Sequence, residues 1–336
     1  MTTRNLSLDD VEDIAFRALT GAGTSEPAAR AVARSTRAAE YDGIRSHGLH
    51  YVPIYAEHVQ CGKVDGKAEP VVTRPKPAAI TVDAASGFAH PAIEAGFEIL
   101  RDAVREQGAI VMTVKNSYNC GVLGYHVERL AEAGLLGIGF TNAPASIAPS
   151  GGTKAVVGTN PFALGVPAAT PGDAAFIIDQ SSSAIAKSEI ALRAREGESI
   201  PEGWALDADG NPTTDPNVAL KGTMVPSGGY KGFGVGLLVE VLAAGLSGAT
   251  LGIHASPFAG TVGGPPRTGQ CFIAMDPDTF SDNTFAERIT GLCAAIEAQD
   301  GTRLPGAKKK AARATTKANG VDVDEALLTR IEAFIA

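Results

Sequence analysis

AAITVDAASGFAHPAIEAGFEILRDAVREQGAIVMTV, residues 78–114, is the part of the sequence from which the fold class is clearest. Its two ends, residues 78–83 and 109–114, are short apolar runs rich in β-branched side chains, and they predict strands. Residues 91–107 between them carry apolar side chains at helical spacing and predict a helix. A strand, a helix and a second strand in succession indicate an α/β body.

The alternation continues toward the C-terminus, and helices flank it at both ends of the chain. We predict a helix over 127–133, strands over 135–141, 162–166 and 176–179, helices over 183–195 and 230–246, and a strand over 271–275. Further helices are predicted over about 7–21, 25–43 and 52–60, and again over 284–298 and 324–336. The first ~75 residues are therefore mostly helical.

Composition excludes several classes of protein. The 336 residues suffice for one large domain or two smaller ones, and the net charge of −8 argues against a nucleic-acid or anionic-membrane partner. Four widely spaced cysteines favour neither a disulfide framework nor structural zinc. The acidic N-terminus does not resemble a signal peptide, and Glu240 interrupts the most apolar stretch, so we expect a cytoplasmic protein without a membrane span.

Well-known site motifs are missing from the sequence. No GxGxxG follows a predicted strand and no GxxxxGK[ST] is present, which argues against a Rossmann or P-loop site. The six histidines form no HExxH or comparable pair, so we predict no metal site.

The cluster RSHGLHYVPIY, residues 45–55, lies at a break between two predicted helices. A hydroxyl next to an imidazole, here Ser46 and His47, can act as a hydrogen-bond donor and proton relay. The alternative is structural: Ser46 caps the third helix and His47 is a surface residue.

Three glycine-bearing loops follow apolar segments, at residues 116–126, 141–161 and 226–234. Their backbone N–H groups can bind an anion, and Lys231 adds a positive charge to the third loop. Each loop alone can be an ordinary turn, but three in one chain favour a phosphate-bearing ligand.

The strings SHG at 46–48, NS at 116–117, GTNP at 158–161 and GGYKG at 228–232, in this order, resemble the type-2 malate/L-lactate dehydrogenase family. PEG at 201–203, DADGNPTTDP at 207–216 and VEVLAAGLSG at 239–248 are most similar to its Δ1-piperideine-2-carboxylate/Δ1-pyrroline-2-carboxylate reductase branch. The resemblance implies an NAD(P)-dependent oxidoreductase that reduces a small 2-oxo acid or cyclic 2-imino acid.

The resemblance also implies an architecture. The implied protein is a homodimer. Each subunit has a non-Rossmann α/β fold, whose sheet is mixed and largely antiparallel, and a helical domain formed by both termini. We accordingly expect residues 78–281 to bind the cofactor, and residues 1–77 with 282–336 to form the helical domain.

Carried over position by position, the resemblance implies roles for individual residues. Ser46, His47 and Glu189 would form the proton relay. The substrate would meet Tyr51, Tyr55, Asn119, Asn142 and Thr159. The cofactor would lie along Cys120, Gly121, Val122, Leu123, Gly124, Ser181, Ser182, Ser183, Lys187, Gly229, Lys231, Leu304, Gly306, Lys308 and Lys309.

The chain departs from the family pattern on the substrate side. Tyr51 stands where most members have an arginine for the substrate carboxylate, and a neutral phenol cannot replace a bidentate guanidinium. Asn119 stands where members have a histidine, and asparagine cannot shuttle a proton. Three interpretations stay open: a reductase with a shifted substrate, one for a non-carboxylate substrate, or a nucleotide-binding member without turnover.

Two further expectations concern alternatives. A Ser-His-Glu hydrolase is disfavoured because Ser46 lies in no GxSxG elbow. NADPH is preferred over NADH because Lys308 to Lys310 lie beside the implied cofactor segment and can meet a 2′-phosphate, although the same lysines also fit a solvated basic helix.

Overall fold

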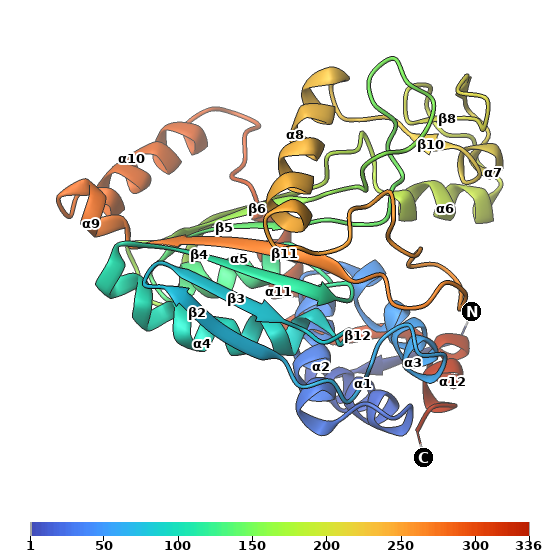
Figure 1. Cartoon of the computed structure of the whole chain (residues 1–336), viewed down its shortest axis with the longest axis horizontal. Coiled ribbons are helices and arrows are strands. Elements are labelled where there is room, and N and C mark those ends of the chain that lie inside the picture. The colour runs from blue at the N-terminus through green and yellow to red at the C-terminus, as the bar shows by residue number, and fades with distance from the viewer. Residues whose placement is uncertain (1, 336) are drawn as a thin grey trace.

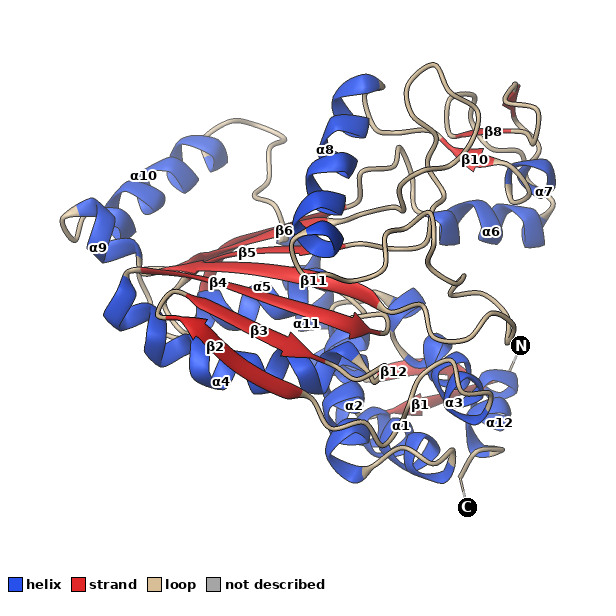
Figure 2. Ribbon diagram, viewed as in Figure 1, coloured by secondary structure: helices blue, strands red, loops and turns tan. Residues whose placement is uncertain are grey.

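One seven-stranded sheet forms the centre of the molecule, seen in the computed structural model of residues 2–335, in which the side chain of Ser188 is left undescribed (Figures 1 and 2). Its strands lie in the order β2-β3-β4-β11-β5-β6-β7. Their bounds are β2 Val71–Lys76, β3 Ala79–Asp83, β4 Ala109–Ser117, β11 Thr268–Met275, β5 Leu136–Thr141, β6 Phe162–Pro167 and β7 Ala174–Gln180.

The sheet is mixed, as expected. β3 and β4 run parallel, because α4 (Ala89–Gln107) carries the chain back between them. The other neighbouring strands are antiparallel. The prediction of an α/β fold with a largely antiparallel sheet is therefore confirmed.

Helices pack on both faces of this sheet (Figure 1). α4 and α5 (Leu123–Glu132) bury their apolar sides against one face, where Phe97, Leu130 and Phe272 belong to the largest core cluster. On the other face lies α8 (Tyr230–Glu240), which continues into a π-helical turn over Val241–Gly245. The sheet is therefore covered on both faces, which leaves its edges and strand ends for the site.

The two ends of the chain meet in a second unit. β1 (Thr3–Leu6) pairs with β12 (Val321–Asp324) in an antiparallel ribbon that the sequence did not predict, because each strand has only four residues. Around it pack α1 (Leu8–Gly21), α2 (Glu26–Tyr41), α3 (Val52–Gln60) and α12 (Glu325–Glu332). Both termini thus belong to one helical layer, as Figure 1 shows.

The remaining elements follow the prediction less closely. α6 (Lys187–Glu196) begins four residues later than expected, because residues 182–184 extend along the turns at Thr159 and Val225 through backbone hydrogen bonds. β8 (Ala205–Leu206), β9 (Pro212–Thr213), β10 (Thr223–Met224) and α7 (Pro216–Ala219) form a small lobe with α6. The basic segment near the C-terminus forms a helix, α11 (Ala307–Asn319).

Some elements that the expected domain boundaries assign to the helical domain lie with the large sheet instead. β2, from within residues 1–77, pairs with β3 in the large sheet. α9 (Pro277–Ser281) and α10 (Phe285–Glu297) lie at the end of the sheet away from α1 and α12 (Figure 1), and α10 contacts β7. The helical layer of the two termini is therefore smaller than the sequence suggested.

Candidate active site

The Ser46–His47 pair lies in a short 3-10 turn before α3. Ser46 Oγ is 3.1 Å from Nδ1 of His47, and the imidazole is half-buried. α3 begins at Val52 with Tyr51 as its N-cap residue, so Ser46 does not cap it. The interpretation of Ser46 as a helix cap and His47 as a surface residue is therefore wrong, and the pair has the geometry of a relay.

Glu40, near the end of α2, holds this turn in place. Its buried Oε1 accepts a 2.7 Å hydrogen bond from the backbone N–H of Leu49. A Cβ on Gly48 would lie only 2.1 Å from the same Oε1, so glycine is required there. The glycine of the SHG string therefore makes room for the carboxylate that fixes the loop after His47.

Asp179, near the end of β7, is an acidic residue whose charge reaches the His47 ring. Burial lowers the pKa of His47, and the charge of Asp179 raises it in part. Burial also raises the pKa of Asp179. A carboxylate near the ring can stabilise the imidazolium, which is the task that the resemblance gave to Glu189.

Glu189, which the resemblance placed in the relay, lies on α6. It is in the first turn of α6, where its Oε1 accepts a 3.3 Å hydrogen bond from Nε of Arg193 in a half-buried pair. In the described part of the chain we find no bond from Glu189 to Ser46 or His47. The charge of Asp179 reaches the His47 ring, so Asp179 joins Glu189 as a candidate for the acid of the relay. The signal in the sequence was an acidic residue at the end of the apolar strand FIID.

The glycine loop before α5 meets Asp179 directly. The N–H of Gly124 donates a 2.8 Å hydrogen bond to Oδ2 of Asp179, and a Cβ on Gly124 would lie 2.7 Å from that oxygen. Gly121 has a φ of 69°, which favours glycine. Cys120, Val122 and Leu123 are buried, and Gly121 is the half-buried residue of this loop.

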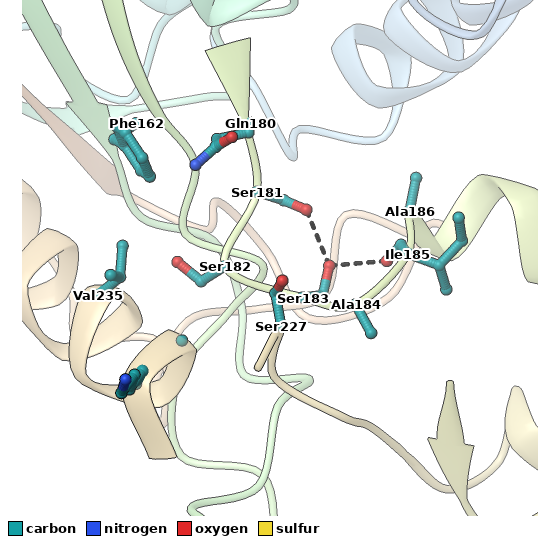
Figure 3. A pocket seen from close by; sticks show the side chains of 12 residues that line it. Phe162, Gln180, Ser181, Ser182, Ser183, Ala184, Ile185, Ala186, Ser227 and Val235 are labelled. Carbon is teal, nitrogen blue, oxygen red and sulfur yellow. Dashed lines mark hydrogen bonds between the residues drawn. The ribbon is translucent and has the colours of Figure 1, made fainter. Parts of the chain in front are cut away.

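The segment after β7 lines a cavity of about 550 Å³ (Figure 3). Ser181, Ser182 and Ser183 line it together with Ser227, which lies beside Ser183 in the figure, and Lys231 and Gly232 of α8 also contribute to its lining. Ser183 Oγ is 2.9 Å from Ser181 Oγ and 2.7 Å from the carbonyl oxygen of Ile185. The expected serines and Lys231 are therefore brought together around one cavity, with Gly229 as the N-cap residue of α8 and Lys187 exposed at the start of α6.

The start of α11 lies against the same strand. Gly306, with a φ of 81°, places its backbone beside Ile177 of β7, and Leu304 precedes it. Lys308 is exposed, whereas Lys309 is largely buried and its Nζ is 3.5 Å from Asp42. The cofactor segments expected at residues 120–124, 181–183 and 304–309 therefore converge on the end of β7.

Two of the expected substrate residues lie beside His47. The rings of Tyr51 and His47 are nearly parallel, with centroids 6.3 Å apart. Asn119 Nδ2 is 3.4 Å from the Tyr51 hydroxyl, while Asn119 Oδ1 accepts a 2.6 Å hydrogen bond from the N–H of Gly121. Burial raises the pKa of Tyr51, so its phenol is a neutral partner.

Tyr55 lies deeper than a substrate ligand should. It is 2% exposed, and its ring meets the rings of Tyr51 and Tyr118 edge to face. Tyr118 in turn forms a hydrogen bond with Nδ1 of His58. Tyr55 therefore supports Tyr51 from the core, which corrects its expected contact with substrate.

Asn142 is likewise a structural residue. It is 2% exposed, its Oδ1 accepts a 2.8 Å hydrogen bond from the N–H of Gly269, and its Nδ2 donates to the carbonyl oxygen of Thr250 at 3.0 Å. Glu240 lies 3.5 Å from the same nitrogen. All polar groups of Asn142 are thus used inside the protein, which corrects its expected role in substrate binding.

The GTNP turn is held by the same carboxylate. Asn160 is fully buried with a φ of 36°, and its Nδ2 donates to Oε2 of Glu240 at 2.7 Å. The N–H of Gly252 donates to Oε1 of Glu240 at 2.7 Å. Thr159 is only half-buried, and its carbonyl oxygen accepts a hydrogen bond from the N–H of Ser182, so its contact with substrate stays a prediction.

Residues 2–335 contain no cluster of three side chains suited to hold a metal ion. They also contain no helix with the length and hydropathy to cross a bilayer.

Comparisons with known proteins identify the family. The sequence profile described as malate/L-lactate dehydrogenase matches residues 6–332. The chain is 40% identical to a (2R)-3-sulfolactate dehydrogenase (NADP(+)) of Chromohalobacter salexigens, with 99% of this chain and 98% of the relative covered. It is 39% identical to a Δ1-pyrroline-2-carboxylate reductase of Ancylobacter novellus, with 98% and 97% covered.

A solved structure agrees with these relatives. The crystal structure of Δ1-piperideine-2-carboxylate reductase from Pseudomonas syringae pv. tomato superposes with a TM-score of 0.93 at 35% identity, covering 99% of this chain and 100% of the other. The resemblance inferred from SHG, GTNP and GGYKG is therefore confirmed. The chain belongs to the malate/L-lactate dehydrogenase family of oxidoreductases.

Proposed function

We propose that this protein is an NADPH-dependent reductase that delivers hydride to the C=N or C=O carbon of a small cyclic 2-imino acid or 2-oxo acid. The observation that carries this proposal is the convergence of Ser46, His47 and Asp179 with the glycine loop at one end of β7. The names of the relatives agree with this choice: a sulfolactate dehydrogenase corresponds to the C=O bond, and the cyclic imino acid reductases correspond to the C=N bond.

The residues present fit a dinucleotide. The cavity after β7 is lined by Ser181 and Lys231, whose hydroxyl and ammonium groups suit phosphate oxygens. Ser182 and Ser183 line it too, but their hydroxyls donate to the carbonyl oxygens of Asn160 and Ile185. When bound, the reduced nicotinamide supplies the hydride.

The protein's own groups manage the proton. His47 in its imidazolium form donates a proton to the nitrogen or oxygen that gains charge as hydride arrives. Ser46 fixes the ring through Nδ1, which leaves Nε2 for the substrate. Asp179 favours the charged ring, so its position offsets part of the loss caused by burial.

Tyr51 and Asn119 are proposed to contact the substrate with neutral hydrogen-bonding groups. Their mutual contact and the parallel packing of Tyr51 on His47 support this role. Because neither side chain carries a charge, they bind the polar group of the substrate through neutral hydrogen bonds and not through an ion pair with a guanidinium. A member that binds the nucleotide without turnover is the second candidate, and these two residues motivate it.

The test is an activity panel. Purified protein is mixed with NADPH or NADH and a set of 2-oxo acids, cyclic 2-imino acids and the corresponding amides, and loss of the reduced nicotinamide absorbance is followed. We expect consumption with at least one substrate, a lower KM for NADPH than for NADH, and loss of activity in His47→Ala. Tight cofactor binding without consumption of any member would favour the second candidate.

We further propose a homodimer that works in the cytoplasm. α8 exposes Tyr230, Leu237 and Leu238, and the π-helical turn after it exposes Val241, which together form an apolar face beside the cavity. A second copy of the chain would cover this face, which sedimentation or light scattering would detect as twice the mass of the chain. The four cysteines are free thiols, which suits a reducing compartment.

A further inference from the structure

The ammonium group of Lys309 lies inside the protein between two carboxylates. Its side chain is 16% exposed, and Nζ is 3.5 Å from Oδ2 of Asp42, whose side chain is 4% exposed. In the described residues Nζ makes no hydrogen bond. This position differs from that of Lys308, which is exposed one residue earlier on α11.

Asp179 lies on the other side of this ammonium. A Cβ placed on Gly124 would be 3.1 Å from Nζ of Lys309 and 2.7 Å from Oδ2 of Asp179. Both charged groups therefore lie beside the bare α-carbon of Gly124, without forming an ion pair of their own among the described residues. The same Oδ2 accepts the N–H of Gly124, so the cation and the backbone act on one carboxylate.

Asp42 does not depend on Lys309 for a partner. Nε of Arg313 donates to Asp42 at 2.6 Å, and the other two nitrogens of Arg313 form a bidentate pair with Glu128 at 2.7 Å each. Bidentate guanidinium pairs of this kind are strong and well oriented. Asp42 therefore keeps a cationic partner when the charge of Lys309 is removed.

We propose that Lys309 is a positioning residue: its ammonium keeps the Asp179 carboxylate ionised and seated on the N–H of Gly124, facing His47, and it is not a ligand of the 2′-phosphate. The proposal rests on the proposed function for its consequence in turnover, but the arrangement itself concerns residues of this chain. Of the lysines on α11 that were expected to bind the 2′-phosphate, the exposed Lys308 then keeps that role.

The groups that face Asp179 set the sign of the expected effect. Burial raises the pKa of Asp179, whereas Lys309, the N–H of Gly124 and His47 lower it, and Asp42 raises it. Removing the charge of Lys309 therefore raises this pKa further. Asp179 then takes up a proton at a higher pH, and the acid limb of the activity profile moves upward with it.

The direct test is a titration of the Asp179 carboxyl in the ligand-free protein. Carbon-13 labelled aspartate is followed by NMR, and Asp179→Asn assigns the signal. We expect Lys309→Met to move the midpoint upward by about one pH unit. Lys309→Arg keeps the positive charge and should titrate as the wild type does. Lys317→Met, an exposed lysine on the same helix, is the matched control.

Turnover supplies the second measurement. The acid limb of kcat in Lys309→Met should move upward equally with NADPH and NADH, and the KM values should change little. An unmoved Asp179 titration, or a rise in KM for NADPH alone, overturns the proposal. If Lys309→Met does not fold by circular dichroism, Lys309→Gln removes the same charge.

The two proposals fail separately. A wild type that consumes no nicotinamide with any substrate overturns the proposed function. In that case a shifted Asp179 titration in Lys309→Met still supports the positioning role, because the measurement needs neither cofactor nor substrate.

Discussion

Asp179 and Glu240 are carboxylates beside a family motif, the first half-buried and the second buried, and their surroundings differ. Glu240 accepts hydrogen bonds from neutral donors, namely the side chains of Asn142 and Asn160 and the N–H of Gly252. Asp179 accepts one N–H, from Gly124, and otherwise faces the titratable side chains of His47 and Lys309.

The difference separates structure from chemistry. A carboxylate surrounded by fixed neutral donors holds turns together, whereas one that faces other ionisable groups can change their protonation. We therefore expect GTNP, beside Glu240, to act as a folding motif, and SHG with the glycine loop, beside Asp179, to be the reactive one. Membership in a family motif alone does not distinguish the two.

The largest effect is expected from the reactive side. His47→Gln removes the proposed proton donor but keeps a side chain that Ser46 can hydrogen-bond. We expect kcat to fall by about 10²- to 10⁴-fold, because a positioned general acid contributes this much. Steady-state nicotinamide oxidation measures the loss, and thermal unfolding should stay close to the wild type. Wild-type turnover in this variant would contradict the relay.

Asp179→Asn and Glu189→Gln form a matched pair of carboxylate-to-amide changes. We expect Asp179→Asn to lower kcat by roughly 10²-fold, since an acid that orients and charges the imidazole is lost. Asp179 raises the pKa of His47, so without it the imidazolium is lost at a lower pH. The alkaline limb of reduction should therefore move to lower pH.

Glu189→Gln should leave kcat and both limbs nearly unchanged, because its half-buried pair with Arg193 lies on α6. The two pH profiles, measured side by side, are the test. A larger loss in Glu189→Gln than in Asp179→Asn would restore the relay that the family resemblance implied.

On the structural side, Glu240→Gln should cost stability. The amide turns one acceptor oxygen into a donor that faces the N–H groups of Asn142, Asn160 or Gly252. We expect the free energy of unfolding to fall by about 1–3 kcal/mol, as for other buried groups left unsatisfied. Chemical denaturation measures this change, and kcat per folded molecule should change little. A normal stability with a large loss of kcat would place Glu240 in the chemistry.

The sequence predicts the α/β core well because its signals are local. Residues 91–107 and 109–114 carry their periodicity within one element, and α4 and β4 form there. β1 and β12 could not be predicted, because four-residue strands gain their stability from a partner more than 300 positions away.

The site divides in the same way. Ser46 and His47 are neighbours in sequence, so their pairing was predictable. The choice between Asp179 and Glu189 depends on where β7 ends relative to the SHG turn, which no local pattern contains. Likewise, only the packed structure shows that Asn142 and Tyr55 use or bury their polar groups.

Burial alone does not decide whether Tyr51 belongs with the structural residues around Glu240 or with the reactive residues around Asp179. The smallest effect is expected from a substitution of this residue. Tyr51→Phe keeps the ring that packs on His47 and Tyr55 but removes the hydroxyl near Asn119. We expect KM for the substrate to rise about threefold to tenfold, the range of one neutral hydrogen bond, with kcat nearly unchanged. Tyr41→Phe, at the end of α2, is the control for loss of a phenol outside the site. If KM stays at its wild-type value while stability falls, the Tyr51 hydroxyl serves the packing of the core, and Tyr51 belongs with Glu240 among the structural residues of the motifs.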